Sequence, residues 1–257
     1  MTDFITIDTC PICAGQLVGK TYTAISNLFA SEYALTFPTQ RYVHYKTCEI
    51  CGAVVQTPRM SDELIYRYYA EGIYRGAMNV KQEGIDRNEM ERAVTDARLI
   101  ARYAGAVATH LDIGCSRGYL LSRVNAPVQI GVEPNHDYVT SETIDGVYDT
   151  LALVPGKFQL ITAIHSLEHE PYPLEQLQLM AGKLMPGGKI VVEVPTWKSN
   201  GGPLRLAHLY YWDEDAMRAL AGLAGGRTAF ELLAPGTLVG QGLSEFVSPD
   251  QLAIALH

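Results

Sequence analysis

An acidic residue and two glycines follow one another at the end of an apolar run, in the stretch Asp112-Ile113-Gly114-Cys115-Ser116-Arg117-Gly118. Glycine accepts positive φ and has no Cβ to keep a ligand away from the backbone. The stretch lacks the Gly-Lys-Ser/Thr ending of a Walker loop and the Gly-x-Gly-x-x-Gly spacing of a dinucleotide loop. It therefore predicts close backbone approach to a small ligand at the carboxyl end of a first strand, where open α/β sheets bind ligands.

A second acidic residue, Glu133, ends the next predicted strand. A carboxylate at that place can accept hydrogen bonds from ribose hydroxyls. No lysine or hydroxyl is placed to hold a phosphate and magnesium. The pair of features predicts a nucleoside-like ligand without phosphates.

Four cysteines form two Cys-x-x-Cys pairs, and they are Cys10, Cys13, Cys48 and Cys51. Two such pairs supply the four thiolates of a tetrahedral zinc site, and such a site has no open position for catalysis. We therefore predict structural zinc and not disulfides, because the chain shows no secretory signal. The fifth cysteine, Cys115, is expected to pack as a small residue against the ligand.

Three histidines are candidates for a general base. His165 and His169 follow the fourth predicted strand, and His208 follows the fifth. A histidine can take up a proton near neutral pH. The competing interpretations are that His165 only lines the ligand pocket and that His169, with Glu168, starts a helix.

Strand-like and helix-like segments alternate from residue 107 onward, which is typical of a parallel sheet with crossover helices. We expect an α/β domain at 107–257, preceded by a zinc-binding β domain at 1–60 and a helical connector at 61–106. Strands are expected at 107–113, 128–133, 147–148, 158–164, 189–194, 228–233 and 243–247. Helices are expected to begin at Tyr119 and His136 and to span 86–104, 174–184 and 213–224.

Composition excludes several classes of protein. The 257 residues carry a net charge of −8, which argues against a nucleic-acid partner, because binding to a phosphate backbone needs a basic face. No apolar run approaches the ~20 residues of a membrane span. Without a predicted signal sequence, the expected location is the cytoplasm.

Four motifs in order resemble those of class I S-adenosylmethionine-dependent methyltransferases over about 107–247. They are Leu-Asp-Ile-Gly-Cys-Ser-Arg-Gly, Gly-Val-Glu-Pro-Asn, Phe-Gln-Leu-Ile-Thr-Ala-Ile-His-Ser-Leu-Glu-His and Leu-Met-Pro-Gly-Gly-Lys-Ile-Val-Val-Glu-Val-Pro. The resemblance implies a Rossmann-like seven-stranded sheet and S-adenosylmethionine as cofactor. Asp112, Gly114 and Gly118 would cradle the methionine part, Glu133 the ribose, and His165 would lie near the sulfonium. The cofactor pocket is expected to be completed by Tyr74, Cys115, Tyr119 and Pro134.

The two cysteine pairs followed by Tyr-Tyr-x-x-x-x-Tyr-Arg are similar to the zinc-binding sugar C-methyltransferases, which act on nucleotide-linked deoxysugars. Members of that family continue into a further C-terminal domain, whereas this sequence ends at His257. The resemblance implies methyl transfer to a nucleotide-linked sugar or a related small biosynthetic intermediate.

Three alternatives remain open from sequence. One is an RNA methyltransferase with a zinc-ribbon reader, and another is a small-molecule O-methyltransferase of secondary metabolism, resembling the ubiquinone-pathway enzymes. The third is a cofactor-binding scaffold without turnover.

Overall fold

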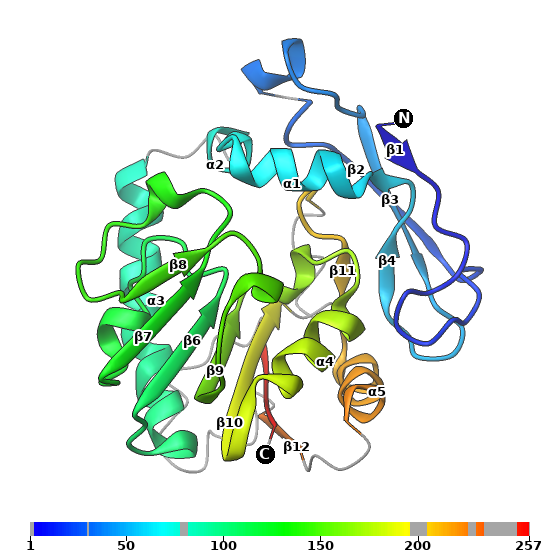
Figure 1. Ribbon diagram of the computed structural model, residues 1–257. Coiled ribbons are helices and arrows are strands. Elements are labelled where there is room, and N and C mark those ends of the chain that lie inside the picture. The colour runs from blue at the N-terminus through cyan, green and yellow to red at the C-terminus, as the bar shows by residue number, and fades with distance from the viewer. Residues whose placement is uncertain are drawn as a thin grey trace.

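The computed structural model describes residues 3–29, 31–77, 82–195, 205–225, 230–233 and 251–256. A large twisted sheet flanked by helices forms one part, and a smaller β unit holding the N-terminus lies beside it (Figure 1). Helix α1 runs across the top between the two parts. Among the described residues, no helix is long and apolar enough to cross a membrane.

The large sheet has the strand order β12-β13-β10-β9-β6-β7-β8. The five strands from β10 to β8 are parallel, and β13 and β12 join antiparallel beside β10. The strands are β6 (Thr109–Ile113), β7 (Val128–Val132), β8 (Gly146–Tyr148), β9 (Phe158–Ile164), β10 (Leu184–Pro195), β12 (Phe230–Leu233) and β13 (Gln251–Leu256). The central strands are nearly continuous apolar runs, because both faces of the sheet are covered.

Helices cover the two faces of this sheet. Helix α3 (Gln82–Ala104) packs Ala93 and Ile100 against Leu160 and Val191 on one face. Helices α4 (Pro173–Gly182) and α5 (Glu214–Ala224) pack in the cluster on the other face. The short 3-10 turns are η1 (Glu32–Leu35), η2 (Leu121–Arg123), η3 (His136–Tyr138), η4 (Leu151–Leu153) and η5 (Leu167–His169).

The small unit contains a four-stranded sheet of order β11-β4-β3-β2. Strands β2 (Thr21–Ile25), β3 (Tyr42–Thr47) and β4 (Val54–Gln56) come from the N-terminal part, but β11 (Tyr210–Tyr211) comes from far along the chain. Strands β1 (Phe4–Ile5) and β5 (Arg59–Met60) pair separately. Because β11 completes the sheet, the segment that follows β10 in the chain is bonded to the N-terminal unit.

Two helices follow the small unit. Ser61 caps α1 (Asp62–Ala70) by accepting a hydrogen bond from the Leu64 amide at 3.2 Å, and serine is one of the residues preferred at this position. A short helix α2 (Ile73–Ala77) follows after Gly72.

Two predicted helices form only 3-10 turns in the structure. The chain from His136 forms the turn η3 and not a longer helix. The chain after Gly118 forms only the 3-10 turn η2 and not a helix beginning at Tyr119. Pro127 lies close behind and restricts the residue before it to extended backbone, which leaves no room for a longer helix. The predicted strand at 243–247 lies outside the described residues, and the strand that pairs with β10 is β13.

Candidate active site

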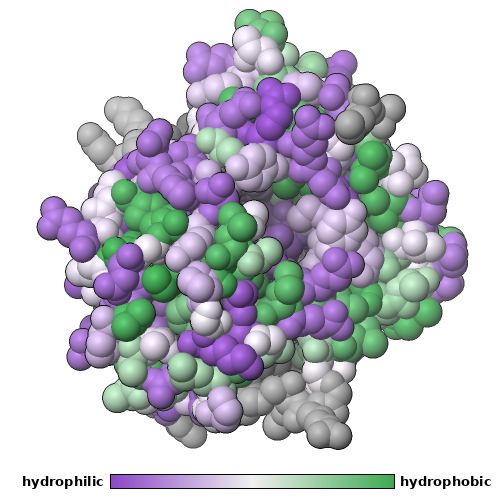
Figure 2. Space-filling model, in the orientation of Figure 1, coloured by the Kyte–Doolittle hydropathy of each residue, from purple (hydrophilic) through white to green (hydrophobic). Residues whose placement is uncertain are grey.

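A cavity of about 870 Å³ opens at the carboxyl ends of β6, β7 and β9, opposite α1, α2 and the segment 205–211. On this face the surface is hollowed near its centre, with hydrophilic and hydrophobic residues mixed around the opening (Figure 2). The cavity lining includes most of the sequence candidates, namely Tyr74, Asp112, Gly114, Cys115, Tyr119, Glu133, Pro134, His165, His169 and His208. One large site therefore brings together residues from several separate segments.

Gly118 does not line the cavity. Its φ is +80°, and a Cβ there would lie 2.5 Å from Cδ1 of Ile144 and 2.9 Å from Cβ of Ser141. The second glycine of the loop is therefore required for the turn and for packing behind it. Gly114, with φ +72°, does face the cavity, and a Cβ there would meet Oγ of Ser166 at 2.8 Å.

Glu133 lies directly after β7 and beside the glycine loop. Its two carboxylate oxygens accept hydrogen bonds from the Ser116 amide at 3.2 Å and the Asn135 amide at 3.0 Å. Each oxygen has a further lone pair, so the carboxylate can still accept ribose hydroxyls. Burial raises the pKa of Glu133, and the two amide hydrogen bonds oppose that rise.

The floor of the cavity is acidic. Asp112 is buried and accepts a hydrogen bond from the Thr162 hydroxyl at 2.6 Å, and burial raises its pKa to about 7. Asp96 on α3 also lines the cavity, and burial together with the nearby charge of Glu193 raises its pKa to about 8. A cationic ligand would relieve both pKa shifts, because a positive charge favours the ionised form of an acid. This acidic lining fits S-adenosylmethionine, because the sulfonium and ammonium groups of that cofactor are positively charged.

A clamp that the sequence did not reveal holds the glycine loop. Arg75 on α2 donates to the Ser116 hydroxyl and forms an ion pair with Glu89 on α3. Ser116 has φ +50°, a left-handed conformation that is uncommon outside glycine. Its hydroxyl also donates to Glu89 at 3.2 Å. Sequence offered only one signal, the position of Arg75 in a loop just before the α/β domain.

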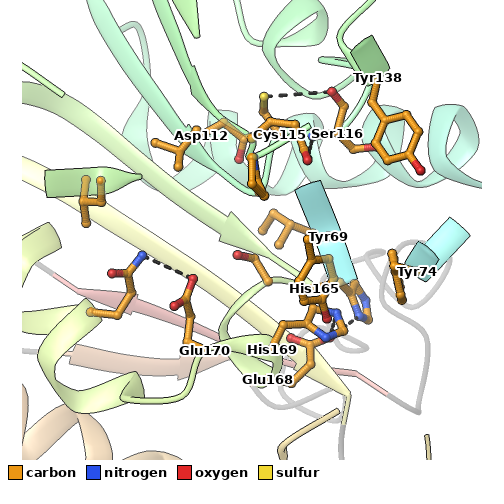
Figure 3. Close-up of a pocket in the computed structure, with 18 of the residues that line it drawn as sticks. Tyr69, Tyr74, Asp112, Cys115, Ser116, Tyr138, His165, Glu168, His169 and Glu170 are labelled. Atoms are coloured by element: carbon orange, nitrogen blue, oxygen red, sulfur yellow. Dashed lines mark hydrogen bonds and ion pairs between the residues drawn. The ribbon is translucent and has the colours of Figure 1, made fainter. Parts of the chain in front are cut away.

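The candidate histidines gather around one carboxylate, and Figure 3 shows His165 and His169 beside Glu168. Glu168 is fully buried, and its Oε1 lies 3.4 Å from Nδ1 of His165 and 3.8 Å from Nε2 of His169. His208 joins them, since ligand atoms of Glu168, His169 and His208 lie within 4.8 Å of one another. The other nitrogen of His165 lies 3.3 Å from Oε1 of Glu193.

The charges of these histidines differ. Burial alone would lower the pKa of His165, but its contacts with Glu168 and Glu193 raise it to about 9, so this ring is protonated at neutral pH. Burial lowers the pKa of His208 to about 3 and also lowers that of His169, so both are neutral. Glu168 is ionised, because the neighbouring histidines outweigh its burial and lower its pKa to about 2. Two neutral bases therefore sit beside a fixed anion.

Aromatic rings enclose this cluster. The ring of His169 contacts those of Tyr69 and Tyr74, each with centroids 5.5 Å apart. The ring of His208 lies 5.0 Å from that of His169 and 5.4 Å from that of Tyr211. These rings form an apolar wall with polar edges along this side of the cavity.

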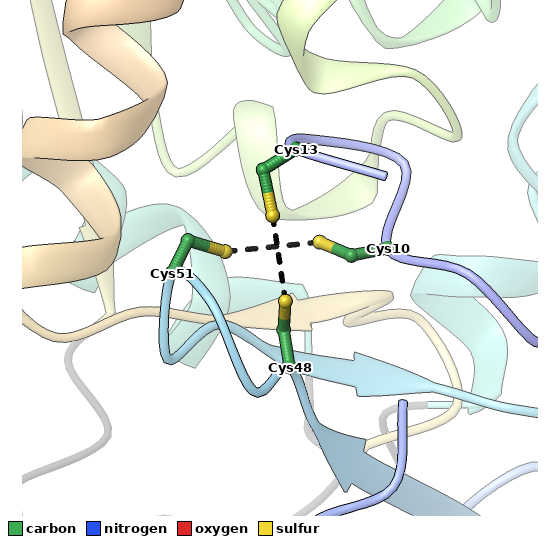
Figure 4. Close-up of side chains that lie close together, drawn as sticks. All are labelled: Cys10, Cys13, Cys48 and Cys51. Carbon is green, nitrogen blue, oxygen red and sulfur yellow. Dashed lines mark hydrogen bonds between the residues drawn. The ribbon is translucent and has the colours of Figure 1, made fainter. Parts of the chain in front are cut away.

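The four cysteines of the N-terminal unit converge on one point (Figure 4), and none of them lines the cavity. Their sulfurs pair across the centre, with Cys10 and Cys51 at 3.7 Å and Cys13 and Cys48 at 3.4 Å. All are free thiols, and the contact with Cys51 lowers the pKa of Cys10 to about 5. Convergent sulfurs without a disulfide are the donor set that zinc takes.

Comparison with known proteins assigns the family. The sequence pattern of the family described as "Methyltransferase domain" matches residues 86–226, which is more than half of the chain. The chain belongs to this family, and its domain is of the class I, S-adenosylmethionine-dependent type.

Relatives agree with this class. The chain is 33% identical over 105 residues to the ubiquinone biosynthesis O-methyltransferase of Xanthomonas campestris pv. campestris (strain B100), a match that covers 35% of the chain and 44% of that relative. The corresponding protein of Xanthomonas euvesicatoria pv. vesicatoria (strain 85-10) is 32% identical over 100 residues, with 33% and 42% covered. The chain thus spans less than half the length of the curated relatives it matches.

The fold is shared with solved methyltransferases of low sequence identity. The plantazolicin methyltransferase BpumL in complex with SAH superposes with a TM-score of 0.52 at 14% identity, over 76% of this chain and 96% of that one. The mitomycin 7-O-methyltransferase MmcR gives 0.51 at 15% identity, over 76% and 57%.

Proposed function

We propose that this protein transfers a methyl group from S-adenosylmethionine to a small molecule, with a nucleotide-linked sugar or a related biosynthetic intermediate as the first acceptor class. The observation that carries the proposal is that an acidic nucleoside cradle and a buried Glu–His cluster open into the same cavity. Bound there, S-adenosylmethionine would supply an electrophilic methyl group.

The residues of the cavity have separate roles. Glu133 would accept the ribose hydroxyls, and Asp112 and Asp96 would attract the positively charged methionine part. The Arg75–Glu89 pair keeps Ser116, and through its amide Glu133, in place. Holding the acceptor and the methyl group in line accounts for much of the rate, on the order of 7–11 kcal/mol.

An acceptor hydroxyl or acidic carbon must lose a proton. We propose His208 as the base, because its buried Nδ1 has no hydrogen-bond partner among the described residues and its ring lies beside the carboxylate of Glu168. His169 is the second choice, since its Nδ1 already contacts the Ala207 carbonyl at 2.8 Å. The ionised Glu168 would stabilise the imidazolium that forms, as the positioning carboxylate does in catalytic triads. His165 already holds its proton and contacts Glu193 and Glu168 instead.

We also propose that residues 1–60 form a structural zinc unit, followed by a connector at 61–106 and the methyltransferase domain at 107–257. The convergent cysteine sulfurs support this division. The aromatic wall at Tyr69, Tyr74 and Tyr211 supports a ring-shaped acceptor, either a sugar or a phenol, and the names of the curated relatives favour testing phenols second.

The proposal is tested by calorimetry with S-adenosylmethionine and by transfer of a radiolabelled methyl group to a panel of nucleotide sugars, phenols and RNA. We expect binding by the wild type, weak or absent binding by Asp112→Asn, and transfer to a small molecule. Transfer to RNA alone would replace the proposal with the zinc-ribbon alternative, and absence of S-adenosylmethionine binding would reject it.

A further inference from the structure

The segment 205–209, which carries His208, has every backbone carbonyl engaged. The hydroxyl of Tyr45 is within hydrogen-bond distance of the carbonyls of Arg205 at 2.5 Å and His208 at 2.6 Å. The side-chain amide of Gln56 lies 3.2 Å from the carbonyls of both Leu206 and His208. Three carbonyls of the segment are therefore held by two side chains.

Both of these side chains belong to the N-terminal unit and not to the methyltransferase domain. Tyr45 lies on β3 and Gln56 ends β4, and each is fully buried. The Gln56 side chain also donates to the Tyr45 hydroxyl at 2.9 Å, so the two act as one bracket. The main chain of Gln56 adds a hydrogen bond from its amide to the Leu209 carbonyl at 2.8 Å.

The opposite side of the segment faces the proposed catalytic cluster. The Ala207 carbonyl contacts Nδ1 of His169 at 2.8 Å, and the Leu209 amide donates to the Glu168 carbonyl at 2.8 Å. Some backbone groups of this segment therefore bond to the bracket of Tyr45 and Gln56, and others bond to the cluster of Glu168 and His169. The hydrogen bonds on both sides hold the backbone of His208 in place, and its ring projects from there.

We propose that Tyr45 and Gln56 are positioning residues that set the place of the His208 ring against Glu168 and His169. The effect expected on turnover rests on the proposed function, whereas the hydrogen bonds from Tyr45 and Gln56 to the segment do not depend on it. The N-terminal unit then orients the acceptor side of the cavity. The cofactor side, built on β6 and β7, receives no hydrogen bond from either side chain among the described contacts.

The test uses the full chain with Tyr45→Phe, which removes one oxygen, and Gln56→Leu, which removes the amide. The matched control is Tyr42→Phe on the same strand, because that side chain is 41% exposed. The probe of the cofactor side is S-adenosylmethionine in calorimetry. The probe of the acceptor side is the NMR signal of the His208 ring at pH 7 in histidine-labelled protein, assigned with His208→Asn.

We expect the affinity for S-adenosylmethionine to stay within about twofold in both variants, as for distant sites, while the His208 signal moves. With an accepted substrate, kcat should fall by up to about 10²-fold at an unchanged KM for the cofactor, the cost of a misplaced catalytic group. Tyr42→Phe should match the wild type. If Gln56→Leu does not fold, Tyr45→Phe decides.

The inference is overturned if the His208 signal in Tyr45→Phe stays at its wild-type position. It is also overturned if the affinity for S-adenosylmethionine falls by the same factor as kcat. A wild type that binds no S-adenosylmethionine while the His208 signal still moves would reject the proposed function and leave the positioning role standing.

Discussion

The two sides of the cavity are built in different ways. The side that we propose for the cofactor is built mainly on one continuous stretch, in which β6, the glycine loop and the end of β7 follow one another from Thr109 to Pro134. Asp96 and the Arg75–Glu89 pair are added to it from α3 and α2. The acceptor side comes from α1 and α2, the turn after β9, and the segment 205–211. Local sequence therefore determines the first side, while tertiary packing determines the second.

The difference extends to charge and rigidity. The cofactor side is acidic, and its loop is held by a left-handed Ser116 inside the Arg75–Glu89 clamp. The acceptor side balances His165 against Glu168 and Glu193 and leaves two neutral imidazoles. The two sides of the cavity therefore differ in the charge that they present.

The largest expected effect is on the N-terminal unit, whose cysteine cluster belongs to neither side of the cavity. Cys48→Ser should lose the metal and unfold the N-terminal sheet, because structural zinc contributes about 10–16 kcal/mol in small zinc-binding peptides. Metal analysis should give about one zinc per wild-type chain. Cys115→Ser, which removes a thiol outside the cluster, is the control and should keep its zinc. Retained folding without metal in Cys48→Ser would show that the cluster is not structural.

His208→Asn tests the acceptor side alone. Removal of a general base lowers turnover by about 10²–10⁴-fold, whereas cofactor affinity should not change. Turnover with the accepted small molecule and calorimetry with S-adenosylmethionine measure the two sides separately. His136→Asn, exposed and outside the cavity, should behave as the wild type. If His208→Asn and His136→Asn gave equal turnover, His169 would replace His208 as the proposed base.

His165→Gln sharpens the electrostatic part of the comparison. The folded-state pKa of about 9 lies above the ordinary 6.5, so His165 contributes stability below about pH 6.5 that is lost as the pH rises through about 9. The contribution is at most about 3 kcal/mol. Urea unfolding should therefore show the wild type more stable than the variant at pH 6 and nearly equal above pH 9. The same difference at both pH values would contradict the proposed ion pairs.

Glu133→Gln perturbs the cofactor side. Loss of charge-assisted hydrogen bonds worth about 1.5–3 kcal/mol should weaken S-adenosylmethionine binding by about 10–100-fold. The ring signal of His208 should stay in place, which makes this variant the reverse of Tyr45→Phe. Glu142→Gln, an exposed carboxylate outside the cavity, is the control. Wild-type affinity in Glu133→Gln would remove this residue from the site.

The cofactor side is predictable from sequence for a physical reason. An apolar run, a glycine turn and an acid at the next strand end are neighbours in the chain, so their pattern is visible without the fold. The Ser61 cap and the central strands follow from equally local signals. The bracket of Tyr45 and Gln56 leaves no such pattern, since it joins β3 and β4 to carbonyls of residues 205–208, which are far away in the chain.

Long-range electrostatics is also hidden from sequence. Asp96 lies on the alanine-rich face of α3, where an acid is out of place, yet only the fold shows that it lines the cavity. Which of the histidines is protonated depends on Glu168 and Glu193, and these two residues approach His165 from different segments. The pattern predicted three candidate bases, and burial and ion pairing distinguish them.

The pairing of β11 with β4 has a consequence for how such a protein can diverge. Backbone hydrogen bonds hold Tyr210 and Tyr211 opposite Val55 and Val54, and they do not depend on which side chains the preceding segment carries. A substitution of Arg205, which lines the cavity but is held through its backbone carbonyl, can therefore change the cavity lining without loosening the sheet. Such a change would alter the side of the cavity opposite the glycine loop, whereas that loop, with Gly114 and Ser116 at positive φ, tolerates little change.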